Sequence, residues 1–183
     1  MNIANTVTII RVLLVPLVVL LYYAPLQGSE WLAAGLFGIA SLTDWLDGYL
    51  ARRLDQASSF GAFLDPVADK LLVVSALVLI AANYPGPWFV LPIALIIARE
   101  VFVSALREWM ASVNQRDAVA VGYIGKVKTT VQMIAIIVLL AASPDWPWPV
   151  LWAGYVLLYL AAFFSVWSMW SYLRKALPVL GLK

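Results

Sequence analysis

Residues 44 to 69 read D44-W-L-D47-G48-Y-L-A51-R52-R-L-D-Q-A-S-S-F-G61-A-F-L-D65-P-V-A-D69, which places four regularly spaced aspartates within segments otherwise apolar enough to lie in a bilayer. A single charge at the centre of a bilayer costs at least about 2.5 kcal/mol. Four carboxylates at this depth therefore require interactions that compensate their charge.

The composition around this stretch is that of an integral membrane protein. Hydrophobic residues make up 64% of the chain and charged residues 12%, and the mean hydropathy is +0.92, whereas soluble domains contain about 45–50% apolar residues. The 183 residues suit one domain over residues 1–183. Cysteine and histidine are both absent, which removes disulfides, thiol nucleophiles and imidazole bases. Proton transfer and metal binding must therefore fall to carboxylates.

Apolar runs of spanning length predict an all-α fold with six transmembrane helices. A helix needs about 20 residues to cross a bilayer core about 30 Å thick, and runs of this length are too long for strands. The expected helices cover residues 7–24, 31–52, 61–83, 88–112, 119–142 and 148–172.

The basic residues predict the orientation of these helices. The connections at 25–30, 84–88 and 143–149 contain no lysine or arginine. The opposite ends carry Arg52, Arg53, Arg107, Arg116, Arg174, Lys175 and Lys183. The positive-inside rule then places both termini and the aspartate-rich stretch on the cytoplasmic side. Aromatic rings are expected at both interfaces: Trp31, Trp88, Trp146 and Trp148 outside, and Trp109, Trp170 and Tyr172 inside.

The aspartate spacing predicts a metal site between two helices. Asp44 and Asp47 lie three residues apart, and Asp65 and Asp69 lie four apart, so each pair shares one helix face. Four carboxylates in one pocket would repel each other unless cations lay between them. An all-oxygen set favours Mg²⁺ first, then Mn²⁺ or Ca²⁺, as one ion or two with shared ligands. Such metals indicate phosphoryl or phosphatidyl transfer.

The pattern D-x2-D-G-x2-A-R-x8-G-x3-D-x3-D resembles the motif of the CDP-alcohol phosphotransferases at all eight defined positions. The resemblance implies a six-helix membrane enzyme, usually a homodimer, that binds a CDP-linked donor and releases CMP. It makes Asp44, Asp47 and Asp65 metal ligands. It also makes Asp69 both a ligand and the catalytic base. The donor site would be lined by Asp44, Gly48, Ala51, Arg52 and Gly61.

Four further segments narrow this resemblance. Residues 2–11, 61–70, 97–110 and 122–130 are similar to bacterial members of the family that join sn-glycerol 3-phosphate to CDP-diacylglycerol. The implied products are phosphatidylglycerophosphate and CMP, and the implied cofactor is Mg²⁺ or Mn²⁺, as two ions. The implied location is the bacterial cytoplasmic membrane, and nucleic acid is not an expected partner. Ala4 stands where the family often has proline.

Cationic residues of the fourth and fifth helices fit this acceptor. Glycerol 3-phosphate is a small dianion, so its site needs fixed cations near the metals. The candidates are Arg99, Arg107, Lys126 and Lys128. Lys126 and Lys128 lie two residues apart and cannot share one helix face, so we expect one to meet the phosphate and the other to reach the interface.

Several alternatives remain open from the sequence. Arg99 could pair with Glu100 instead of a substrate, and Arg107, Lys126 and Lys128 could be ordinary positive-inside charges. Arg11 could either extend to the interface or meet the donor phosphates. The acceptor could instead be phosphatidylglycerol, for cardiolipin synthesis, or an inositol phosphate. Intramembrane carboxylates also occur in ion-coupled transporters, which form the alternative class.

Overall fold

The computed structural model describes residues 3–54, 59–115, 123–143 and 146–179, and every regular element within these ranges is an α-helix. The helices are α1 (Ile3–Tyr22), α2 (Ser29–Leu54), α3 (Ser59–Asn83), α4 (Pro87–Ser112), α5 (Tyr123–Ala141) and α6 (Trp148–Ala176). The prediction of an all-helical fold with six helices is confirmed. Helix α1 begins before residue 7 and α6 continues beyond residue 172, because the helical backbone extends past the apolar runs.

Prolines mark several helix boundaries. Helix α4 begins with Pro87 after Gly86, and Pro147 precedes α6. Proline is favoured in the first turn because its missing N–H would have no partner there. Pro16, Pro66 and Pro92 lie inside helices, where packed membrane helices tolerate them.

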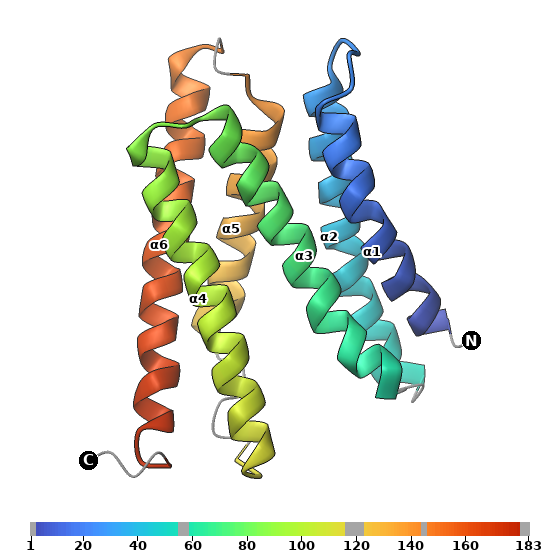
Figure 1. Cartoon of the computed structure of the whole chain (residues 1–183), viewed down its shortest axis with the longest axis vertical. Helices are drawn as coiled ribbons and strands as arrows, with labels where there is room; N and C mark the ends of the chain where they lie inside the picture. Colours follow the sequence, from blue (N-terminus) through green and yellow to red (C-terminus); the bar gives the residue numbers. More distant parts are fainter. Residues whose placement is uncertain (1–2, 55–58, 116–122, 144–145, 180–183) are drawn as a thin grey trace.

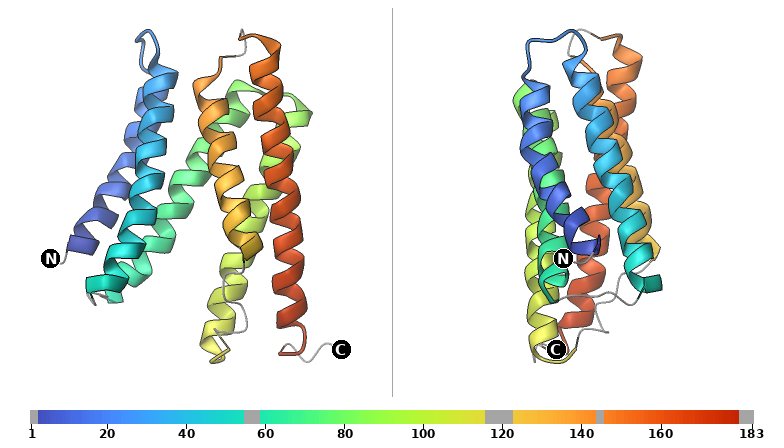
Figure 2. Two further views of the ribbon diagram at one scale, coloured as in Figure 1. Left: turned by 180° about the vertical axis from the view of Figure 1, so that it is seen from behind. Right: turned by 90° about the vertical axis from the view of Figure 1, so that its right-hand side faces the viewer.

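The helices form an elongated bundle (Figure 1). Connections α1–α2, α3–α4 and α5–α6 meet at one end, which we call the connection end, and both termini lie toward the other, which we call the terminal end. Helix α3 packs against α1 and also contacts α4 and α5, while α6 packs on α4 and α5. The group α1–α3 diverges from the group α4–α6 toward the terminal end (Figures 1 and 2).

Apolar side chains both fill the centre of the bundle and cover its outside. Phe37, Leu77, Ile136 and Leu139 are fully buried in the core, whereas large apolar side chains along α1, α4 and α6 are exposed. Three described segments are long and apolar enough to cross a membrane, and a shorter apolar helix covers Thr8–Tyr22. The three segments are Pro66–Asn83, Pro87–Ser112 and Trp148–Ala176. This outward apolar surface is that of a membrane protein.

Aromatic side chains gather at both ends of the bundle. At the connection end Trp31 and Trp146 lie 5.2 Å apart between ring centroids, and Trp88 and Trp148 are exposed. Trp109 and Trp170 are exposed on the lower parts of α4 and α6. Tyr172 corrects the expectation of an interfacial ring, since it is buried in a small cluster with Val103, Met110 and Ala176.

Candidate active site

The aspartate-rich stretch lies on two consecutive helices that contact each other. Asp44 and Asp47 belong to α2, while Asp65 and Asp69 belong to α3, and the two helices are in contact. The helical spacing inferred for each pair is therefore present in the backbone. The side chains of Asp44, Asp47, Ala51, Arg52 and Asp65, and the Gly48 position, lie outside what the structure describes, so their roles stay predictions.

Asp69 is the motif aspartate whose side chain the structure describes. It is partly buried on α3, next to the fully buried Ala68. It lies close enough to Lys128 of α5 for an electrostatic interaction. The Lys70 ammonium donates a 3.1 Å hydrogen bond to the Pro66 carbonyl in its own helix. Asp69 is therefore within electrostatic range of a cation contributed by another helix.

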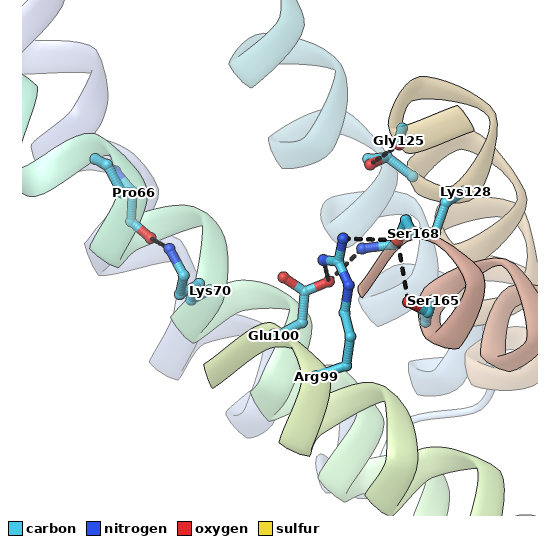
Figure 3. Close-up of polar contacts among 9 residues, drawn as sticks. Pro66, Lys70, Arg99, Glu100, Gly125, Lys128, Ser165 and Ser168 are labelled. Atoms are coloured by element: carbon cyan, nitrogen blue, oxygen red, sulfur yellow. Dashed lines mark hydrogen bonds and ion pairs between the residues drawn. The ribbon is translucent and has the colours of Figure 1, made fainter. Parts of the chain in front are cut away.

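A buried group of charged and polar side chains joins α4, α5 and α6 (Figure 3). Glu100 Oε1 accepts a hydrogen bond from Arg99 Nη1 at 3.2 Å and also pairs with Lys128 Nζ. Arg99 Nη2 donates to Ser168 Oγ at 2.9 Å, and that hydroxyl donates to the Ser165 carbonyl at 3.0 Å. We call Arg99, Glu100, Lys128 and Ser168 the Glu100 cluster.

Helical periodicity explains why these residues meet. Arg99 lies on the buried face of α4 together with Ile96 and Val103. Lys128 and Gln132, four apart on α5, are both buried, and Ser165 and Ser168 belong to the buried face of α6. Small serine side chains on α6 leave space for the Arg99 guanidinium to approach. Charged groups at this depth are stabilised by pairing with one another.

The structure separates the four predicted acceptor residues into two pairs. Arg99 and Lys128 are buried with 7% and 4% of their surfaces exposed and meet at Glu100, whereas Arg107 and Lys126 are exposed. Among the described residues, no hydrogen bond or ion pair involves Arg107 or the side chain of Lys126. The alternative pairing of Arg99 with Glu100 is observed. Lys126 and Lys128 do lie on different faces of α5, as their spacing predicts.

Other polar residues are also buried, and no motif or spacing in the sequence distinguishes them beyond their position within apolar runs. Arg11 on α1 is 1% exposed, so its side chain does not extend to the interface, and the nearby Thr8 is also buried. Gln132 is buried, and within the described structure its Oε1 has no hydrogen-bond partner. The sequence does not predict Ser168 as a member of the Glu100 cluster, because a serine within an apolar helix has no distinctive spacing.

The candidate metal ligands fit a hard divalent cation. The four candidate ligands are carboxylates at helical spacing on two contacting helices, with no histidine or cysteine in the chain, and hard cations prefer oxygen ligands. Among the side chains that the structure describes, no group of three or more metal-ligating residues occurs. The other three candidate ligands lie outside this described set, so the metal site stays a prediction.

A cavity lies at the connection end, and its lining includes no residue of the Glu100 cluster. Its volume is about 530 Å³, and its lining is Tyr84, Trp88, Phe89, Trp148, Leu151, Trp152 and Tyr155. This lining offers aromatic surface and no charged group. The cavity is therefore unsuited to a phosphate and does not belong to the candidate active site.

Comparison with known proteins agrees with the motif. Residues 1–167 match the family described as CDP-alcohol phosphatidyltransferase. The chain is 50% identical over 175 residues to the CDP-diacylglycerol–glycerol-3-phosphate 3-phosphatidyltransferase of Escherichia coli strain K12, covering 96% of this chain and 94% of that protein. Proteins of the same name from Shigella sonnei strain Ss046 and Shigella flexneri serotype 5b show the same identity and coverage. The chain therefore belongs to the CDP-alcohol phosphatidyltransferase family.

Proposed function

We propose that this protein transfers the phosphatidyl group of CDP-diacylglycerol to sn-glycerol 3-phosphate, giving phosphatidylglycerophosphate and CMP in phospholipid biosynthesis. The observation that carries the proposal is the 50% identity, over 96% of the chain, to a relative named for this reaction. The eight-position motif and the buried cations Arg99 and Lys128 support it.

In the proposed reaction, Asp69 is the general base. Its carboxylate accepts the proton of the free primary hydroxyl of glycerol 3-phosphate. The hydroxyl oxygen forms a bond to the β-phosphorus of CDP-diacylglycerol, the bond from that phosphorus to the bridging oxygen breaks, and CMP leaves with the electron pair. The electrostatic interaction of Asp69 with Lys128 supports this role, because it relates the base to a cation suited to the acceptor phosphate.

The proposed metal ligands are Asp44, Asp47, Asp65 and Asp69. When bound there, Mg²⁺ or Mn²⁺, as two ions, supplies positive charge to the donor pyrophosphate. Asp44, Gly48, Ala51, Arg52 and Gly61 are the proposed donor-site residues. The small ones among them let the cytidine diphosphate approach the helix backbone closely.

For the acceptor phosphate, we assign Arg99 and Lys128 as the buried cations and keep Arg107 and Lys126 as exposed candidates. A bidentate guanidinium and an ammonium together match the oxygens of a phosphate dianion. The two exposed residues would act on the aqueous side of the site.

We further propose six transmembrane spans in a bacterial cytoplasmic membrane, with both termini and the active site facing the cytoplasm, and a homodimeric assembly. The basic residues at the terminal end and their absence from the connections at 25–30, 84–88 and 143–149 support this orientation. It places the site where soluble glycerol 3-phosphate arrives and CMP departs.

The test is an acceptor comparison with the purified protein. CDP-diacylglycerol in detergent micelles is incubated with Mg²⁺ and, separately, glycerol 3-phosphate, phosphatidylglycerol, inositol phosphate or no acceptor, and CMP release is measured. Glycerol 3-phosphate should give the highest rate, with phosphatidylglycerophosphate as the lipid product. CMP release that depends on another acceptor and not on glycerol 3-phosphate would reassign the substrate within the family.

A further inference from the structure

Glu100 connects two buried cations through one oxygen atom. Its Oε1 contacts both Arg99 Nη1 and Lys128 Nζ. Without this carboxylate, the two positive charges would repel each other. The side chains of Arg99 and Lys128 are 8% and 5% exposed, and that of Glu100 is 16% exposed. One carboxylate thus holds a guanidinium and an ammonium side by side in a site largely closed to water.

The far side of the Arg99 guanidinium is fixed independently. Its Nη2 donates to Ser168 Oγ of α6, so Arg99 is held between Glu100 and α6. Lys128 comes from α5 and Glu100 from α4. The position of the two cationic groups is therefore set by three helices that converge on Glu100 (Figure 3).

The Glu100 cluster is within electrostatic range of the candidate base. Lys128 interacts electrostatically with Asp69 of α3, and Glu100 interacts with Lys70, which follows Asp69 on α3. Two cations and one anion leave the group formed by Arg99, Glu100 and Lys128 with a net charge of +1 (2 − 1). This surplus is available to an incoming anion, whereas a simple neutral ion pair would offer none.

We propose that Glu100 is a positioning residue for the acceptor: it holds Arg99 and Lys128 together beside Asp69, so that they present a paired cationic site to the phosphate of glycerol 3-phosphate. Glu100 itself, being an anion, does not bind the phosphate. The inference rests on the proposed function, because it assigns the anion-binding role of the same site.

The test measures the KM for each of the two substrates separately. Glu100→Gln keeps the size of the side chain and removes its charge. The KM for glycerol 3-phosphate should rise about tenfold or more, as expected when one charged hydrogen bond to the phosphate is lost. The KM for CDP-diacylglycerol should stay within about twofold, since the donor motif is on α2 and α3. Initial rates of CMP release over a concentration series of each substrate give both constants. Glu108→Gln on the exposed side of α4 is the matched control and should change neither.

Two further variants distinguish positioning from general stabilisation. Glu100→Asp keeps the charge on a shorter side chain and should give an intermediate KM for glycerol 3-phosphate. Because Glu100 holds both Lys128 and Arg99, the KM for glycerol 3-phosphate of the double variant E100Q/K128Q should be higher than that of Lys128→Gln alone but lower than the product of the two single effects predicts. Glu100→Gln would leave the buried Lys128 ammonium without its carboxylate, and the double variant removes that ammonium, so it also remains informative if Glu100→Gln does not fold.

Failure of the proposed function and failure of the Glu100 inference give different results. An inactive wild-type protein with glycerol 3-phosphate would remove the function itself. If the wild type is active, two results for Glu100→Gln would overturn only this inference. They are an unchanged KM for glycerol 3-phosphate and an equal rise of both KM values. Simple additivity of the E100Q and K128Q effects would also overturn the inference. Where Glu100→Gln does not fold, the inference is overturned if E100Q/K128Q has the KM of K128Q alone or if Glu100→Asp keeps the wild-type KM.

Discussion

Arg99 Nη2 and Ser168 Oγ are joined by a 2.9 Å hydrogen bond that links α4 to α6 across 69 positions of sequence. Replacing Ser168 with alanine leaves a buried guanidinium donor without this acceptor, which costs about 1–3 kcal/mol. We expect a lower thermal unfolding temperature in detergent for Ser168→Ala. Ser112→Ala is the control, since the exposed Ser112 hydroxyl bonds only to Trp109 O of its own helix. Equal unfolding temperatures for the two variants would show that the contact contributes no stability.

Asp69→Asn tests the base. The amide cannot accept the acceptor proton, so CMP release should fall by about 10²-fold or more. Elution in gel filtration and the unfolding temperature should stay close to those of the wild type. Asp145→Asn, in the α5–α6 connection of the sequence, should retain wild-type turnover. Substantial activity in Asp69→Asn would remove Asp69 from the role of base.

Chelation tests the carboxylate site. Because the chain has no histidine or cysteine to hold a softer metal, CMP release should stop in EDTA and return when Mg²⁺ is added in excess. Zn²⁺ should restore it poorly, since the site offers only oxygen ligands. Activity that persists after exhaustive chelation would contradict a metal-dependent mechanism.

Gly154 tests the packing of α5 against α6. A Cβ at this position would lie 2.6 Å from Leu139 Cδ2 and 2.9 Å from Leu139 Cγ, closer than real contacts allow. Gly154→Ala should therefore destabilise the protein by about 1–3 kcal/mol, seen as earlier thermal unfolding. Gly35→Ala on α2 is the control, because nothing lies within 4 Å of its added Cβ. Its expected effect is a gain of about 0.5–1 kcal/mol from helix propensity, and similar shifts in both variants would refute the tight contact.

Tyr84, at the connection end, makes the stability of the folded state depend on pH. Its hydroxyl donates a 2.7 Å hydrogen bond to the Ala142 carbonyl, and burial, with a smaller contribution from Tyr22, raises its pKa from 10.0 to about 12. Because the folded state holds this proton more tightly than the unfolded state, the contribution to stability is complete below pH 10 and is lost as the pH rises through about 12.

Tyr84→Phe should therefore be less stable by about 1 kcal/mol at neutral pH and should lose less stability than the wild type between pH 10 and 12. Thermal unfolding in detergent across this range measures the difference. Tyr23→Phe, at an exposed ring, should follow the wild-type curve. Parallel curves for Tyr84→Phe and the wild type would contradict the assignment.

Much of the fold could be predicted from apolar run length, because a bilayer requires about 20 apolar residues for each spanning helix. Helix ends were less predictable, since hydropathy does not register the polar first turn of α1 or the last turn of α6. Tyr172 shows a second limit. An aromatic residue near a helix end can lie at the interface or pack inside, and the crossing of α4 and α6 decides which.

By itself, the sequence determined the reaction class and the location of the candidate donor and metal site. Asp44, Asp47, Asp65 and Asp69 occur at fixed spacing on neighbouring helices, so local helical geometry suffices to group each pair. Only the tertiary structure decided which cations meet. The pairing of Lys128 with Glu100 and the hydrogen bond from Arg99 to Ser168 depend on how α4, α5 and α6 pack, which no local spacing encodes.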